Sequence, residues 1–352
     1  MTTGKRIAAA AIVIVVCMLA GVIYLQQSGP TKTSATGVTL PDLLGRGSDP
    51  KDTPSVSSSG ASTPTTKTAA NPVRLMYISR AADAFGKLVV AEGSPLTPKV
   101  QALSCERVAF GGTRGICLQS SGGVVPTYSG LIVDRNYQQT AEFGLGGLPS
   151  RAQVSPNGRW GAVTVFVTGH AYTGAGEFST RTTLIDLNIN WHVDLEQFAV
   201  FKDGEPYSPT DRNLWGITFT PDSNAFYATM KTGSTTYLMK GDPANKRLDV
   251  VAETAECPAI SPDGKTIAFK SREGDRYRLV AFNVANGQRR VLEGAGYLDD
   301  QVEWLDNHTV LFGVDRSTLG SGRRSDIWKY DLDTGAERTI VAENAESPIV
   351  LR

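Results

Sequence analysis

Residues 72–352 are predicted to form an all-β domain, and three observations support this fold class. Short runs rich in Val, Ile, Phe, Tyr and Thr recur along the segment and are bounded by Gly, Pro, Asn and Asp. No stretch of it has sustained helical periodicity. A phrase containing four such runs also repeats along the chain, which indicates a series of similar antiparallel sheets.

The clearest repeat is CPAISPDGKTIAFKSREGDRYRLVAFNVANGQRRVLEG, residues 257–294. It predicts four strands, PAIS, TIAFKS, YRLVAFNV and QRRVLE. Turns are expected at Asp263-Gly264 and Asn286-Gly287, because these dipeptides accept the positive φ angles of tight hairpins. One repeat is therefore a four-stranded meander, whose strands we call A to D.

Related phrases begin at VSPNGRWGAV, FTPDSNAFYA and WLDNHTVLF. If Asn157, Asp222, Asp263 and Asp306 are equivalent, the spacings between them are 65, 41 and 43 residues. A looser copy, CERVAFGGTRGICLQ, begins at Cys105. Four strands recurring every 40 to 45 residues or so are typical of β-propeller blades.

The end of the chain, VAENAESPIVLR at 341–352, repeats part of VAETAECPAI at 251–260. It therefore predicts a strand A with no strands after it. The segments VRLMYIS at 73–79 and KLVVAE at 87–92 have no strand A before them. Pairing the two ends gives one composite blade. Five further blades begin near Cys105, Ala152, Gly216, Cys257 and Val302, so we expect a six-bladed ring closed by its C-terminal strand.

The N-terminal region differs from this domain. Residues 1–6 include Lys5 and Arg6, and residues 7–25 contain no charge. A helix of that length spans about 28 Å, close to the thickness of a bilayer core. We expect a single-pass signal anchor with residues 1–6 in the cytoplasm and the rest outside, by the positive-inside rule. A cleaved signal peptide is the alternative. Val16 before Cys17 does not fit a lipoprotein signal.

Residues 26–71 are rich in Ser, Thr, Pro and Gly, and no aromatic residue occurs between Tyr24 and Tyr77. Such a segment has too little apolar surface to form a core. It is predicted to be a disordered linker that keeps the domain near the membrane. Its composition resembles that of exported actinobacterial proteins, which favours a bacterial cell membrane as the setting.

The SPDGK turn followed by an apolar strand, together with YDLDTG at 330–335, resembles the repeats of TolB and its relatives. The resemblance covers residues 72–352 and implies a six-bladed propeller of the WD40-like type. TolB has an α/β domain before its propeller, whereas here a membrane span and a linker are expected. No TolB binding motif is matched, so the resemblance assigns no site residue.

Cys105 and Cys117 lie symmetrically about the Gly111-Gly112 turn. They would face each other across an A–B hairpin and could form a disulfide outside the cytoplasm. Two buried thiols are the alternative. Cys257 has no evident partner and is expected to be a small core residue.

The repeated turns join strands A and B and are short, whereas the insertions fall between strands B and C or between blades. They occupy residues 168–180, 200–213 and 315–326, and we expect them on the opposite face of the disc, the long-loop face. Their aromatic and charged residues are predicted to bind a partner, since such loops on a rigid scaffold often carry function. Solvated loops without a function are the alternative. The candidates are His170, Tyr172, Glu177, Lys202, Tyr207, Arg212, Arg316, Arg323 and Arg324.

The chain has 35 basic and 35 acidic residues, which argues against nucleic-acid binding. It has no G-x-S-x-G motif and only 3 His. His170 and Glu177 are a weak basis for a metal site, so no cofactor is expected. We therefore predict a non-catalytic scaffold that binds an envelope protein or cell-wall component. A small-ligand or glycan sensor, or a propeller hydrolase or lactonase, is the alternative.

Overall fold

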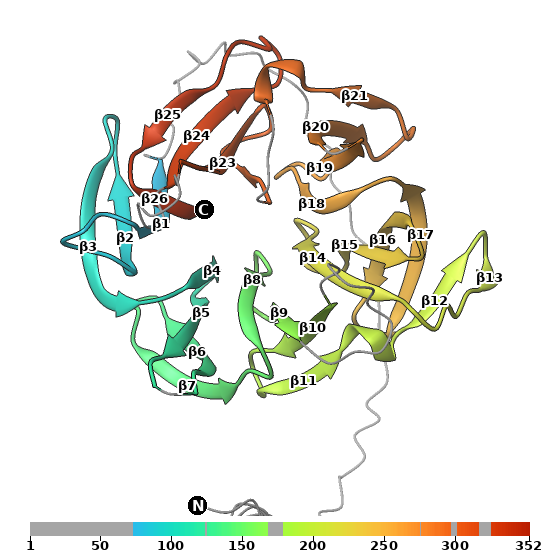
Figure 1. Cartoon of the computed structure of the whole chain (residues 1–352), viewed down its shortest axis with the longest axis horizontal. Helices are drawn as coiled ribbons and strands as arrows, with labels where there is room; N and C mark the ends of the chain where they lie inside the picture. The colour runs from blue at the N-terminus through green and yellow to red at the C-terminus, as the bar shows by residue number, and fades with distance from the viewer. Residues whose placement is uncertain (1–72, 124, 168–178, 275, 297–300, 317–324) are drawn as a thin grey trace, which may run out of the picture. The chain divides into compact units, whose positions relative to one another are not determined.

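The computed structural model describes residues 73–123, 125–167, 179–274, 276–296, 301–316 and 325–352. The chain divides into two units, 1–67 and Thr68–Arg352, and all the described residues belong to the second. Its strands form six sheets arranged around a central axis (Figure 1). The all-β, six-bladed propeller predicted from the repeats is confirmed.

Each blade is a meander whose strand A lies nearest the axis. The strands are, in blade 1, β26 (Ala345–Val350), β1 (Arg74–Ser79), β2 (Lys87–Glu92) and β3 (Thr97–Ser104); in blade 2, β4 (Arg107–Gly111), β5 (Arg114–Ser121), β6 (Thr127–Asp134) and β7 (Gln139–Gly144); and in blade 3, β8 (Leu148–Val154), β9 (Trp160–Val167), β10 (Ser179–Asp186) and β11 (Trp191–Asp194).

The other three blades follow the same order. They comprise, in blade 4, β14 (Asn213–Phe219), β15 (Phe226–Thr232), β16 (Thr235–Asp242) and β17 (Arg247–Glu253); in blade 5, β18 (Glu256–Ile260), β19 (Thr266–Glu273), β20 (Arg276–Asn283) and β21 (Arg289–Val291); and in blade 6, β22 (Glu303–Trp304), β23 (Thr309–Asp315), β24 (Ser325–Asp331) and β25 (Thr339–Ala342).

Two short 3-10 turns, Leu195–Gln197 and Glu293–Ala295, are the only helices among the described residues. Neither could cross a bilayer, and the described part of the chain contains no helix long and apolar enough to do so. The predicted membrane span at 7–25 and the linker at 26–71 lie outside the described residues.

The ring closes by antiparallel pairing of the C-terminal strand β26 with β1, as predicted. Leu75 pairs with Val350 and Met76 pairs with Ile349. A buried ion pair adds to this closure, because the carboxylate of Glu346 in β26 contacts the guanidinium group of Arg80. Glu346 Oε1 also lies 2.7 Å from Arg107 Nη1 of β4, which links blade 1 to blade 2.

The A–B turns explain why the S-P-D/N phrase is repeated. The side-chain oxygen of Asn157, Asp222, Asp263 or Asp306 accepts a hydrogen bond from the backbone N–H two residues later. This closes an Asx turn, which suits a tight connection between strands. In three of the turns a preceding Ser or Thr hydroxyl donates to the same side chain, at 2.6 to 2.8 Å.

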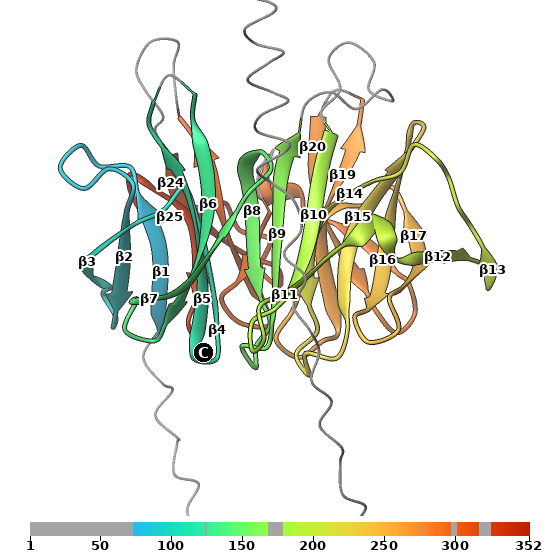
Figure 2. The same ribbon diagram turned by 90° about the horizontal axis from the view of Figure 1, so that it is seen from below.

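Blade 4 departs from the sequence prediction. Residues 200–213 were expected to be a connecting loop, but part of this region forms β12 (Ala199–Lys202) and β13 (Glu205–Pro206). The strand β12 pairs in parallel with β17 and extends blade 4 to six strands. The β12–β13 hairpin projects from the rim of the disc (Figures 1 and 2).

Cys105 and Cys117 are joined by a disulfide between the start of blade 2 and β5, with their Cα atoms 5.4 Å apart. Cys257 is a buried free cysteine. The disulfide closes a short loop and holds the inner edge of blade 2 to its neighbouring strand.

The closing strand provides a first test of stability. Ile349 is 7% exposed in β26, whereas Ile340 is 44% exposed in the outer strand β25. We expect Ile349→Ala to lower the free energy of unfolding by about 2–5 kcal/mol, because it removes a packed side chain. The matched variant Ile340→Ala should change it by about 0.5 kcal/mol or less. Urea denaturation measures both. Equal effects, or an unchanged melting temperature after deletion of residues 347–352, would contradict the closure.

The carboxylates of the A–B turns should make the stability of the fold depend on pH. Hydrogen bonds, chiefly from Thr220 to Asp222 and from Ser261 to Asp263, hold the pKa of each carboxyl below its ordinary value. Each therefore stabilises the fold above its unfolded pKa of about 3.9, and loses this contribution as pH falls towards the folded pKa. Blade 3 uses the non-titrating Asn157 instead. In thermal melts, the melting temperature of the double variant Asp222→Asn/Asp263→Asn should thus fall less than that of the parent protein between about pH 5 and pH 3. A steeper loss than in the parent protein would refute this role.

Candidate functional site

A cavity of about 590 Å³ lies on the propeller axis and is built by the innermost strands of all six blades. Most of its lining comes from the ends of the A strands and from the A–B turns that follow them, and Arg74 of β1 and residues 135–137 of the β6–β7 turn complete it. It therefore opens on the short-turn face, opposite the long-loop face singled out from the sequence. The C-terminus is drawn at this edge of the disc (Figure 2).

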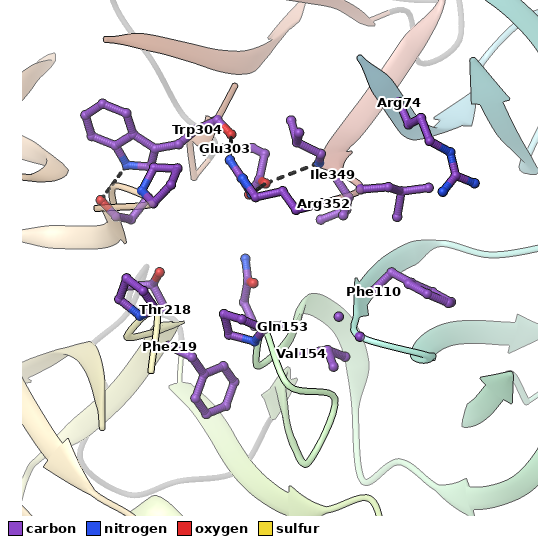
Figure 3. Close-up of a pocket in the computed structure, with 18 of the residues that line it drawn as sticks. Arg74, Phe110, Gln153, Val154, Thr218, Phe219, Glu303, Trp304, Ile349 and Arg352 are labelled. Atoms are coloured by element: carbon purple, nitrogen blue, oxygen red, sulfur yellow. Dashed lines mark hydrogen bonds and ion pairs between the residues drawn. The ribbon is translucent and has the colours of Figure 1, made fainter. Parts of the chain in front are cut away.

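The repeated turn determines which residues reach the cavity. In blades 3, 4 and 5 the last residues of strand A precede the turn phrase, and the equivalent residues Gln153, Thr218 and Ala259 line the cavity. A bulge in β14, between Trp215 and Thr218, adjusts the register of the strand just before this point. The inner strands thus present corresponding positions to one central space (Figure 3).

Blade 6 contributes a carboxylate to the cavity. Glu303 accepts a hydrogen bond from Val350 N at 3.2 Å and lies 3.4 Å from Arg352 Nη1. Burial raises the pKa of the Glu303 carboxyl, while the Arg352 guanidinium opposes that rise. Trp304 is fixed beside it, because its indole N–H donates to Ala259 O at 2.9 Å.

Basic and aromatic groups gather where blades 1 and 2 meet. Arg74 pairs with Glu92 at 2.7 Å, and Tyr137 packs edge-on against Phe110 with ring centroids 5.9 Å apart. Burial raises the pKa of Tyr137. Arg135 also lines the cavity, and no ion pair to it is found among the described residues. Figure 3 shows Arg74 and Phe110 on the opposite side of the cavity from Trp304 and Thr218.

Apolar side chains complete the walls. Val154, Phe219, Ile260 and Ile349 line the cavity from four different blades. The site thus combines an apolar wall with guanidinium and carboxylate groups, which is the composition of a surface that holds a polypeptide or another amphipathic ligand. Among the described residues no cluster of three or more His, Cys, Asp or Glu could hold a metal ion.

Four of the nine residues predicted on the long-loop face belong to the described part of the chain, and they lie in different places. Lys202 and Tyr207 lie at the outer edge of blade 4, where Lys202 Nζ is 3.2 Å from Glu253 Oε1 and the Tyr207 and Tyr237 rings are 6.3 Å apart. These contacts fasten the 200–213 region onto the blade.

The other two described candidates contact different parts of the propeller. Arg212 donates a hydrogen bond to the backbone oxygen of Glu196, and Arg316 pairs with the buried Asp326 in blade 6. Five candidates lie outside the described residues, and their role in binding stays a prediction. They are His170, Tyr172, Glu177, Arg323 and Arg324.

The cavity residues were not predicted from the sequence, because the repeated turns are fully explained by their structural role. Their residue types carry no signal of their own, since Gln153, Thr218 and Ala259 are ordinary strand residues. The signal that could have found them is positional. In a propeller, residues that precede an A–B turn come from every blade to the same mouth of the axis.

No protein-family model matches the chain, and no curated protein matches it. The structure is similar to TolB from Acinetobacter baumannii, with a TM-score of 0.55 and 17% sequence identity over 80% of this chain. It is also similar to a putative TolB from Agrobacterium tumefaciens (TM-score 0.48, 10% identity, 79% of this chain and 93% of that chain) and to an oligogalacturonate lyase in complex with manganese (TM-score 0.48, 12% identity, 74% and 75%).

The chain spans 66% of the length of the Acinetobacter TolB chain. At this level of identity the similarity establishes a TolB-like six-bladed propeller fold. A fold of this kind supports many activities, so function has to be argued from the site.

A thiol introduced into the cavity tests whether the space is open. Cys105 and Cys117 form a disulfide and Cys257 is buried, so only Cys17 needs removal as background. In a Cys17→Ser parent, Gln153→Cys should react with a small water-soluble maleimide under native conditions. The parent should not react, and mass spectrometry of the intact chain distinguishes the two. Labelling of Gln153→Cys only after denaturation would show that the cavity is closed.

Proposed function

We propose that this chain is a non-catalytic binding scaffold whose propeller holds an envelope protein or cell-wall component in the central cavity. The observation that carries the proposal is the cavity itself, which all six inner strands build at one mouth of the axis. Its lining belongs to rigid strands and short turns. A partner therefore meets a preformed surface, which lowers the entropic cost of binding.

The chemistry of the lining supports a polypeptide segment as the bound group. Aromatic and arginine side chains are enriched where protein interfaces are strongest. Phe110 and Tyr137 supply the aromatic surface, and Arg135 supplies a charge not neutralised by any described residue. Glu303 is already held by Val350 and Arg352, so its carboxylate orients the wall of the cavity.

We further propose that the propeller acts outside the cytoplasm, tethered to a bacterial membrane by residues 7–25. The uncharged segment at 7–25 and the low-complexity linker at 26–71 support this location. The Cys105–Cys117 disulfide supports it independently, because such bonds persist in oxidising compartments.

Site-specific crosslinking tests the cavity as the binding site. A photoreactive amino acid in place of Gln153 in the full chain should capture one partner in the native envelope. The same amino acid in place of Lys240, exposed in β16 outside the cavity, should not. Once the partner is identified, Arg135→Glu should weaken the affinity for it roughly tenfold or more, since this variant reverses an unpaired charge in the cavity.

The matched control for this variant is Lys240→Glu, which reverses a charge away from the cavity and should leave affinity unchanged. Two results would refute the cavity assignment. One is equal weakening by both variants, and the other is capture only from positions in the inserted segments, such as Tyr207 or Arg316. The second result would instead support recognition by the inserted loops.

A further inference from the structure

A second pocket, of about 360 Å³, lies between blades 3 and 4, and the central cavity does not include it. Its walls are the C–D turns of the two blades, around Ile189 and Ala244. Its floor is made by their A–B turns, where Asn157 N donates to Ser223 Oγ at 3.2 Å. The volume is at the small end of the range for ligand pockets.

Two side-chain amides in this pocket are fixed in orientation, and only one of the two hydrogen-bonding atoms of each is bonded within the protein. Asn157 Oδ1 accepts from Ser155 Oγ and Arg159 N, which leaves its Nδ2 group as a donor. Asn224 Nδ2 donates to Asp222 Oδ2 at 3.1 Å, which leaves its Oδ1 atom as an acceptor. Within the described part of the chain neither free atom has a partner. A hydroxyl group both donates and accepts, so this pair suits a polyhydroxylated ligand.

The same pocket contains exposed apolar surface. Ile189 is 73% exposed and Trp191 is 38% exposed, although both lie next to regular strand structure. The largely buried Trp160 also lines the pocket. Aromatic rings of this kind pack against the apolar faces of sugar rings, and a few placed polar groups then fix the orientation of the ligand.

The charge of the pocket favours an acidic ligand. Lys246 Nζ lies 5.1 Å from the centre of the Trp191 ring, and no described acidic group forms an ion pair with it. Arg159 Nε pairs with Asp186 at 3.1 Å, while its guanidinium carbon lies 4.6 Å from the centre of the Trp160 ring. The pocket thus has two cations and one carboxylate, and a ligand acid group can pair with Lys246.

We propose that the pocket between blades 3 and 4 binds an acidic saccharide. Its hydroxyl groups are held by Asn157 and Asn224, its apolar ring face packs against Trp191 and Ile189, and its acid group pairs with Lys246. This site is separate from the central cavity, so a partner and a glycan can be bound at the same time. A sugar-bearing cell-envelope polymer is the class of ligand that this chemistry suits.

Isothermal titration calorimetry with the full chain tests the proposal. The probes are a tetrasaccharide of alternating glucuronate and N-acetylglucosamine, a mannuronate tetramer, and a neutral tetramer of N-acetylglucosamine. We expect at least one acidic probe to bind, and more tightly than the neutral one. Lys246→Glu and Trp191→Ala should each weaken this binding roughly tenfold or more. Lys240→Glu, the matched charge reversal outside the pocket, should not change it.

Three outcomes would overturn the proposal. They are no binding of either acidic probe, unchanged affinity in both pocket variants, and binding of a tetraglutamate peptide as tight as that of the acidic sugars. The last outcome would show that the pocket recognises acid groups without recognising a saccharide. Thermal melts of both variants confirm that they remain folded. Arg135→Glu in the central cavity should leave saccharide affinity unchanged, which separates this test from that of the proposed function.

Discussion

The pairing of β26 with β1 is the constraint on which the rest of the structure depends. A propeller blade contacts only its two neighbours, so an unclosed ring would expose two blade faces and unpaired strand edges. Here the contact is made by segments more than 250 residues apart in the sequence, as shown by Leu75 opposite Val350. Glu346 extends the closure beyond blade 1, because its carboxylate also contacts Arg107 of the next blade.

Closure determines the geometry of the central cavity. With all six inner strands held in a ring, the residues that precede the A–B turns meet at one mouth of the axis. The Asx turns keep these connections short, which leaves the mouth open. The same device builds the floor of the second pocket, where the turns of blades 3 and 4 are linked by Asn157 and Ser223. One repeated turn thus produces both candidate sites.

The fold was largely predictable from the sequence, because it depends on local signals that repeat. Two signals were sufficient to predict the blades and their closure. They are the Asp263-Gly264 turn and the repetition of part of residues 251–260 in residues 341–352. The β12–β13 addition was not predictable, since the parallel pairing of Val200 with Leu248 depends on how blade 4 packs and not on a turn motif. The candidate functional site was harder to predict from the sequence than the fold. Tyr207 was chosen for its residue type, yet it packs against Tyr237, whereas Gln153 matters through its position alone.

Arg352, which follows the closing strand β26, is part of the wall of the central cavity, where it contacts Glu303. Any peptide fused after this residue would therefore begin inside the space proposed for the partner. An affinity tag or fluorescent protein at this end would compete with the ligand through its high local concentration. Labels for binding studies are therefore better placed on the outer strands of the blades than after Arg352.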